Sequence, residues 1–313
     1  MARTSVVTIL WFCAARFVRR HYTAWTSPCR AATARASEQY EQVRSGDQGE
    51  RGQLFNEVPA LYDRVRPAYP DELFADLVAV TAVDEDSSVL EVGCGTGQAT
   101  RSLAQLGCAV TAIEPGAEMA DMARQRLARF PNLAIETSTF ETWDERDRRF
   151  DLIVAASSWH WVDPGVGWSR AHSILHPGGW LALLGHVVIR RTDEPEVYAA
   201  AADLHARFVP DNPDWGHPPL EDEVQATSHD WGPPHENHDE LFGPTIVRWY
   251  PTVQHFDGAG FADLLRTLSV YRHLDPSVRE PLLDAIAERI RTDLGDHATR
   301  RYLTVLRVGQ RRN

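Results

Sequence analysis

From about residue 54, short runs of β-branched and apolar residues alternate with longer segments whose apolar positions recur at helical spacing. The short runs predict strands at residues 88–92, 109–113, 132–136, 150–155, 180–185, 248–256 and 302–308. The longer segments predict helices at residues 71–80, from the glycines after 92 to about 106, 118–130, 196–208, 260–269 and 282–291.

Strands that alternate with helices predict an α/β protein with a doubly wound, mostly parallel seven-stranded sheet covered by helices on both faces. Ligands of such sheets bind outside the carboxyl ends of the strands. We therefore expect the loops after Val92, Ile113, Glu136 and Ala155 to line one site.

Two segments do not fit this alternation. Residues 1–37 contain six arginines and no Asp or Glu, which suits an organellar transit peptide, and a secretory signal is a second alternative. Because all 32 basic residues of the chain are arginine, which indicates a bacterial source, we favour a dispensable, disordered leader over 1–50. Residues 186–245 are rich in Pro, Trp and His and are expected to form an insertion that acts as a substrate lid. Residues 51–185 would then be the core with its N-terminal lid, and 246–313 would complete the sheet.

Composition narrows the range of partners. The net charge is −12, and removing residues 1–37 with their six arginines leaves −12 − 6 = −18 for the rest of the chain. An acidic protein repels phosphate backbones, which disfavours nucleic acid and favours a small-molecule substrate. No apolar stretch approaches the about 20 residues that cross a bilayer. The four cysteines form no Cys-x-x-Cys pair, which favours a reduced, cytoplasmic setting.

The sequence EVGCGTG at 91–97 joins the first expected strand to the next helix. Gly93, Gly95 and Gly97 at this spacing allow a tight turn that brings a ligand against the main chain, where a Cβ would clash. A dinucleotide site needs its third glycine or an alanine at position 98, which is Gln98. A phosphate-binding P-loop needs a lysine, and the chain has none.

Glu114 ends the second expected strand, 17 residues after Gly97. A carboxylate at this place can accept hydrogen bonds from the two hydroxyls of a ribose. The alternative is an acid that interacts favourably with the N-terminal dipole of the following helix.

With the glycine loop and Glu114 in place, residues 54–185 resemble the class I methyltransferases, in the group called methyltransferase type 11. Two further segments, YDRVRPAYP at 62–70 and SSWHWVDP at 157–164, resemble proteins related to trans-aconitate methyltransferase. The resemblance implies a Rossmann-like methyltransferase fold and S-adenosyl-L-methionine as the cofactor. The segment 186–245 has little in common with the family.

By this resemblance, the glycine loop holds the methionine part of the cofactor, Glu114 the ribose, and Pro115 the adenine plane. Ser138 and Thr139 stand where relatives often carry an acid for the adenine amino group, so hydroxyl or backbone contacts are expected there. The carbonyls of Ala155 and Ala156 would receive the methionine ammonium. The full set implied for the cofactor is Glu91, Gly93, Cys94, Gly95, Gly97, Glu114, Pro115, Thr139, Phe140, Ala155 and Ala156.

The substrate side centres on His160, which lies between Trp159 and Trp161 after a buried strand. His160 is a candidate general base or hydrogen-bond donor to the substrate, and the tryptophans would shape an apolar pocket. The alternative is a packed histidine among core tryptophans. Tyr62 and Arg66 would fold over the site, where Arg66 could pair with a carboxylate, unless it is a surface arginine beside Asp63.

The stretch with His229, His235 and His238 invites a metal site, together with Asp230 and Asp239. Its spacing matches no standard ligand set, so no metal is expected and a solvated loop or lid is favoured.

The sequence therefore predicts an enzyme that transfers a methyl group from S-adenosylmethionine to a small molecule, with an oxygen of a carboxylate or hydroxyl as the favoured acceptor. The alternatives are an NAD(P)-dependent oxidoreductase of Rossmann type and a non-catalytic binder of S-adenosylmethionine.

Overall fold

The computed structural model of the protein describes residues 55–210, 217–227 and 238–313. The leader expected over 1–50 lies outside these ranges. Among the described residues, no helix is long and apolar enough to span a lipid bilayer.

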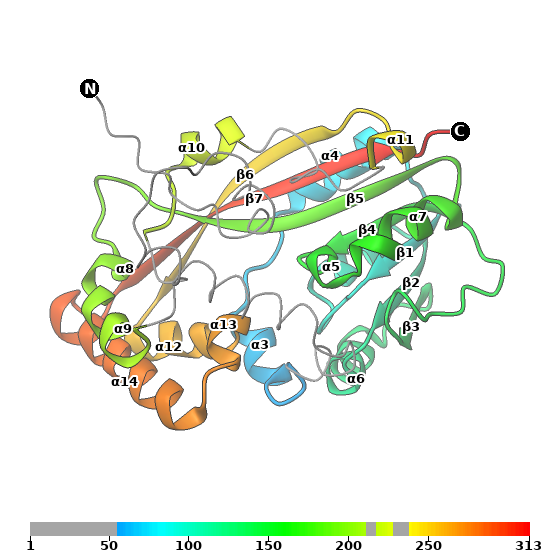
Figure 1. The fold of residues 1–313 in the computed structure, drawn as a ribbon. Helices are drawn as coiled ribbons and strands as arrows, with labels where there is room; N and C mark the ends of the chain where they lie inside the picture. The colour runs from blue at the N-terminus through cyan, green and yellow to red at the C-terminus, as the bar shows by residue number, and fades with distance from the viewer. Residues whose placement is uncertain (1–54, 211–216, 228–237) are drawn as a thin grey trace. The chain divides into compact units, whose positions relative to one another are not determined.

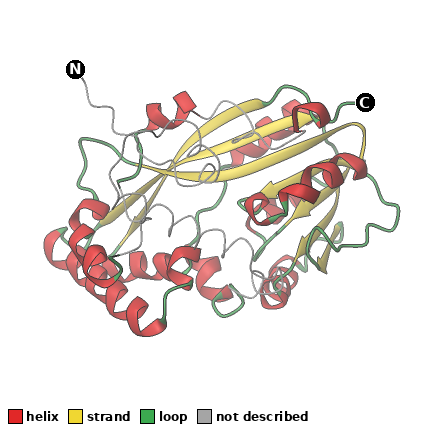
Figure 2. Ribbon diagram, viewed as in Figure 1, coloured by secondary structure: helices red, strands yellow, loops and turns green. Residues whose placement is uncertain are grey.

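Seven strands form one sheet in the order β3-β2-β1-β4-β5-β7-β6 (Figures 1 and 2). Strands β1 to β5 pair in parallel. β7 is antiparallel to β5, since Arg311 donates its backbone N–H to Gly179 (2.8 Å) while His186 contacts Thr304 (2.9 Å). The doubly wound, mostly parallel sheet is thus confirmed. The strands are β1 (Ser88–Val92), β2 (Ala109–Glu114), β3 (Leu133–Thr137), β4 (Phe150–Ala156), β5 (Leu175–Ile189), β6 (Ile246–Phe256) and β7 (Ala298–Gln310).

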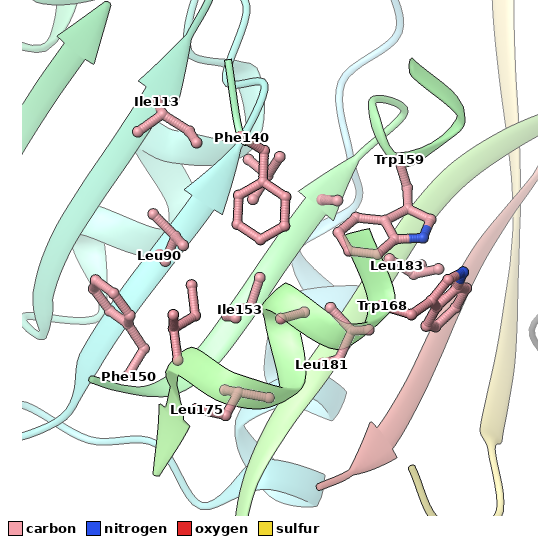
Figure 3. Packing of buried hydrophobic residues seen from close by; sticks show 14 of the residues in the cluster. Leu90, Ile113, Phe140, Phe150, Ile153, Trp159, Trp168, Leu175, Leu181 and Leu183 are labelled. Carbon is pink, nitrogen blue, oxygen red and sulfur yellow. The ribbon is translucent and has the colours of Figure 1, made fainter. Parts of the chain in front are cut away.

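Buried side chains alternate between the two faces of the sheet, as the pleat of a strand requires. Leu90 of β1 and Ile153 of β4 pack towards α7 (Pro164–Ile174), in the apolar cluster shown in Figure 3. Val89 and Leu152, their neighbours in sequence, pack towards α4 (Asp71–Thr81) and α5 (Gln98–Gln105). Both faces of the parallel strands are therefore covered, which leaves their carboxyl ends as the place for a ligand.

Helix α7 was not expected from the sequence. It begins after Asp163, whose carboxylate accepts the N–H of Gly165 (2.8 Å), and Pro164 fills the first helical position. Both features are ordinary helix starts. Two further helices are α3 (Pro59–Val65), which precedes the first strand, and α6 (Ala117–Leu127), which lies between β2 and β3.

The chain divides into two compact units. Of the described residues, one unit contains 55–187, 238–252 and 302–313, and the other contains 188–210, 217–227 and 253–301. The second unit has its own core, built by helices α8 (Val197–Ala200), α9 (Ala202–Phe208), α12 (Gly258–Arg266), α13 (Ser269–Arg272) and α14 (Pro276–Asp293).

This division differs from the boundaries expected at 185 and 245. Phe261 and Ile286, beyond the expected boundary at 245, pack with Val197 and Leu204 of the expected insertion. The described part of 186–245 also holds α10 (Glu221–Thr227) and α11 (His238–Leu241).

Candidate active site

The glycine loop follows β1 at the carboxyl edge of the sheet. All three glycines adopt positive φ, with 71° at Gly93, 58° at Gly95 and 93° at Gly97. The backbone N–H groups of Gly93 and Cys94 both donate to the carbonyl of Ile113, at 2.8 and 3.1 Å. The left-handed conformation, which glycine adopts without steric cost, thus turns the chain tightly while tying the loop to β2.

A side chain would have a different effect at each glycine. A Cβ at Gly93 would lie 2.6 Å from Ser158, and one at Gly97 would lie 2.6 Å from Leu127. At Gly95 the nearest atom would be Met119 Cε at 3.7 Å, an ordinary contact. Gly93 and Gly97 are therefore needed for packing, whereas at Gly95 a Cβ would make only ordinary contacts, so packing alone does not require a glycine there.

Glu114 connects the two loops that follow β1 and β2. Its Oε2 accepts the N–H of Gly95 and its Oε1 accepts the N–H of Gly116, both at 2.9 Å. Burial raises the pKa of Glu114, and the two N–H groups oppose this shift. Each oxygen keeps a second lone pair, so the carboxylate can still accept hydrogen bonds from vicinal hydroxyls.

Glu91 is fully buried in β1, and neither carboxylate oxygen accepts a hydrogen bond of normal geometry from the described residues, the hydroxyl of Thr100 being the one neighbour that favours its charged form. Burial raises its pKa to about 7, the charge of Glu114 adds to this, and the hydroxyl of Thr100 opposes it. A buried carboxylate without a partner is costly, and a cationic group would offset that cost. The positive-φ glycine loop, Glu91 and Glu114 therefore fit S-adenosylmethionine, which carries an ammonium, a sulfonium and a ribose.

The loop after β3 lies beside Glu114, because Ser138 donates its N–H to the carbonyl of Glu114 (3.1 Å). Pro115 is exposed, as a residue that contacts a ligand's adenine would be. The Thr139 hydroxyl already bonds that of Thr142 (2.8 Å), while Phe140 is buried and packs 5.9 Å from the Trp159 ring (Figure 3). Phe140 therefore belongs to the core behind this loop.

At the end of β4, Ala155 is buried and Ala156 is half-buried. Ser157 follows with a φ of 57°, which is uncommon for a residue other than glycine. Its N–H donates to the carbonyl of Leu184 (2.8 Å), and its hydroxyl bonds the hydroxyl of Tyr69 (2.8 Å). The next residue, Ser158, donates its hydroxyl to the carbonyl of Val92. This strained turn thus lies against the start of the glycine loop.

His160 lies on the short helical turn Trp159–Trp161 and is exposed, whereas Trp159 is buried against Trp168, with ring centroids 5.3 Å apart (Figure 3). Desolvation by the surrounding protein and the charge of Arg66 hold the pKa of His160 below its usual 6.5. His160 is therefore neutral at pH 7.

Trp159 belongs to the core and does not shape a pocket directly. Trp161 is half-buried, 4.9 Å from the His160 ring and 6.3 Å from the Phe55 ring. The guanidinium of Arg66 lies 4.7 Å from the centre of the Tyr62 ring. Tyr62 and Arg66 thus lie in the same region as His160 and Trp161, and the role of Arg66 towards a substrate stays a prediction.

Four residues of this region were missed at the sequence level: Asp63, Tyr69, Ser157 and His186. Asp63, Tyr69 and Ser157 lie inside the quoted segments 62–70 and 157–164. His186 directly follows the strand predicted at 180–185, at the edge where a site was expected. It stacks on Tyr69 with ring centroids 4.4 Å apart, and burial and Arg66 lower its pKa to about 3.

The histidine-rich stretch is only partly described. His238 is buried at the start of α11, where it pairs with Asp239 (3.1 Å), so this end of the stretch is packed rather than solvated. His229, Asp230 and His235 lie outside the described residues. Within the described ranges, no three His, Cys, Asp or Glu residues are grouped to hold a metal ion.

With this geometry in view, comparison with known proteins identifies the domain. Residues 90–183 match the family model described as Methyltransferase domain. The chain therefore carries a class I methyltransferase domain, and the resemblance inferred from its motifs is confirmed.

Individual relatives agree with this assignment. An uncharacterized methyltransferase of Mycobacterium tuberculosis is 35% identical over 130 residues, which cover 42% of this chain and 51% of that protein. Trans-aconitate 2-methyltransferase of Variovorax paradoxus is 34% identical over 133 residues, covering 40% and 48%. The chain thus spans about half the length of the curated relatives it matches.

Among solved structures, a protein of Anaeromyxobacter dehalogenans described as a type II methyltransferase superposes with a TM-score of 0.51. It is 22% identical, and the match covers 78% of this chain and 97% of that one. At this level of identity, the likeness supports the fold alone.

Proposed function

We propose that the protein binds S-adenosylmethionine and transfers its methyl group to an oxygen atom, of a carboxylate or a hydroxyl, in a small-molecule acceptor. The observation that carries this proposal is the bridge that Glu114 makes between Gly95 and Gly116, beside a loop whose three glycines all adopt positive φ. An NAD(P)-dependent oxidoreductase is disfavoured, because Gln98 occupies the position where its fingerprint requires glycine or alanine.

Different residues would bind different parts of this cofactor. Gly95 and its neighbours would receive the methionine part, Glu91 would face its positive charges, and Glu114 would hold the ribose. When bound, the cofactor supplies a methyl group on a sulfonium, which is already activated for transfer. The protein then has to hold the acceptor oxygen in line with that methyl group, and orientation can supply most of the acceleration.

On the acceptor side, Arg66 offers a positive charge, and His160 offers a neutral imidazole. A guanidinium can bind a carboxylate of the acceptor through two hydrogen bonds. A carboxylate is ionised at neutral pH and needs no base. A neutral imidazole next to it can orient the reacting oxygen, or accept a proton where the acceptor is a hydroxyl.

The proposal is tested by measuring S-adenosylhomocysteine formation with a panel of small acceptors. The panel includes trans-aconitate, on which one relative acts by name, together with other di- and tricarboxylates and phenols. Turnover with an oxygen acceptor supports the proposal. Cofactor binding with no turnover on any acceptor would favour the non-catalytic alternative, and binding of NAD instead would favour the oxidoreductase.

A further inference from the structure

Asp63 of α3 is fastened to the glycine loop. Its Oδ1 accepts the hydroxyl of Thr96 (3.1 Å) and forms an ion pair with Arg126 of α6, whose guanidinium also donates to the Thr96 carbonyl (3.0 Å). Thr96 is fully buried between Gly95 and Gly97. One face of α3 is therefore bound to the backbone that is expected to hold the cofactor.

Tyr69 is fastened to the second backbone turn of the site. Its hydroxyl bonds Ser157 (2.8 Å), directly after the β4 residues expected to receive the methionine ammonium. Its ring is held between His186, stacked at 4.4 Å, and Phe74, edge-on at 6.5 Å. Burial raises the pKa of Tyr69, so its hydroxyl stays protonated and available for this bond.

Arg66 lies midway between these two attachments. Its N–H ends α3 by donating to the carbonyl of Tyr62 (3.0 Å), and its guanidinium covers the Tyr62 ring. The charge of Arg66 affects both His160 and His186. The place of this charge in the site therefore depends on how residues 59–70 are held at both ends.

We propose that Asp63 and Tyr69 are positioning residues that lock residues 59–70, here called the N-terminal clamp, to the two backbone turns of the cofactor site and thereby place Arg66 and Tyr62. This inference rests on the proposed function, because it assumes that both turns contact S-adenosylmethionine. Neither residue has to touch the cofactor or the acceptor. Each acts through the turn to which it is bonded.

The clamp has a specific energetic signature. Both attachments hold one short segment against the two turns of the cofactor site, so losing either one loosens the support that the segment gives to both turns. Residues that act through a shared element show non-additive effects. The Kd of the double variant should therefore be little higher than that of whichever single variant binds S-adenosylhomocysteine less tightly. Two independent stabilising contacts would instead give losses that multiply.

The test uses the full chain and S-adenosylhomocysteine as the probe. Calorimetry measures its Kd for the wild type, Asp63→Asn, Tyr69→Phe and the double variant. Hydrogen exchange of residues 59–70 is followed with and without the probe. Each single variant should raise Kd by about three- to tenfold, because Tyr69→Phe loses a hydrogen bond and Asp63→Asn loses the charge that pairs with Arg126. Each should also abolish the protection that the probe gives to 59–70, while Asp63→Glu should recover part of both.

Two variants serve as matched controls. Tyr250→Phe removes a hydroxyl that donates to Asp76 (2.6 Å), and Asp71→Asn removes an exposed acid at the start of α4. Both should leave Kd and the protection of 59–70 unchanged. If Asp63→Asn and Tyr69→Phe behave like these controls, the clamp is overturned. A wild type that does not bind S-adenosylhomocysteine at all would instead overturn the proposed function, and the two failures are therefore distinguishable.

Discussion

The carboxylate of Glu114 accepts the backbone N–H of Gly95 at 2.9 Å, across 19 positions in the sequence. The residue expected to bind ribose thus also fixes the loop expected to bind methionine. Both roles depend on one side chain, so the two ends of the cofactor site are coupled before any ligand binds.

The first prediction follows from this coupling. Glu114→Ala should weaken S-adenosylhomocysteine binding by about 1.5–3 kcal/mol, the usual effect of losing hydrogen bonds to a charged group. Methionine, which lacks the ribose, should also bind more weakly to this variant, because the loop loses the bond to Gly95. Calorimetry with both ligands checks this. Unchanged affinity for both ligands would remove Glu114 from the site.

The second prediction concerns Gly95. Gly95→Ala should keep the fold at a cost of about 1–2 kcal/mol for the left-handed backbone, because its Cβ would meet nothing closer than 3.7 Å. The same methyl should occupy ligand space and reduce cofactor affinity by at least about tenfold. Gly107→Ala is the control, since its φ of 91° carries the same strain with its nearest neighbour at 3.6 Å, outside the site. Equal cofactor affinity in the two variants would contradict the assignment of the loop.

The third prediction concerns Glu91 and pH. Burial raises its pKa from 4.5 in the unfolded chain to about 7. The folded state therefore holds this proton more tightly, and the free energy of unfolding should fall as pH rises from 4.5 to 7, by at most about 3 kcal/mol. Urea unfolding at several pH values should show this fall in the wild type and a smaller one in Glu91→Gln. Glu118→Gln, at an exposed position of α6, is the control. Identical pH profiles for the wild type and Glu91→Gln would contradict the raised pKa.

The fourth prediction concerns His160. Its lowered pKa moves any titration below 6.5, so kcat/KM should be flat between about pH 7 and 9 with a carboxylate acceptor. His160→Asn should then raise KM for the acceptor severalfold and leave the Kd of the cofactor unchanged. His176→Asn is the control, because His176 is exposed at the amino end of β5, away from the candidate site, and its loss should change neither the KM of the acceptor nor the Kd of the cofactor. A fall in turnover of about 10²–10⁴ would instead identify His160 as a general base. No change in either parameter would leave His160 as a packing residue.

The parallel strands could be placed from sequence because they are short apolar runs buried on both faces, as Val89 and Leu90 of β1 illustrate. The length of β5 could not, since Pro177, Gly178 and Gly179 are typical of a turn, yet they lie within the strand. Antiparallel pairing with β7 provides backbone hydrogen bonds to this stretch, where the carbonyl of Gly179 accepts the N–H of Arg311 (2.8 Å). Such pairing is a long-range property that local patterns do not contain.

The cofactor loops were predictable for a similar reason, because glycine spacing and a following acid are local signals. The contacts of the N-terminal clamp could not be predicted, since Asp63 and Thr96 are 33 positions apart in the sequence and Tyr69 and Ser157 are 88 apart. Nothing in either segment alone indicates which polar groups meet. The helices at 258–293 could be predicted from the spacing of their apolar residues. Their packing against residues 197–208 could not, because it joins segments far apart in the sequence.

The central claim is that the loop after β1 and Glu114 together form a site for S-adenosylmethionine. Calorimetric titration of the full chain with this cofactor, and in parallel with NAD, tests it most directly. The account predicts saturable binding of S-adenosylmethionine at one site per chain, weakened in both Gly95→Ala and Glu114→Ala, with no heat of binding from NAD. Absence of S-adenosylmethionine binding, or binding that neither substitution weakens, would contradict it.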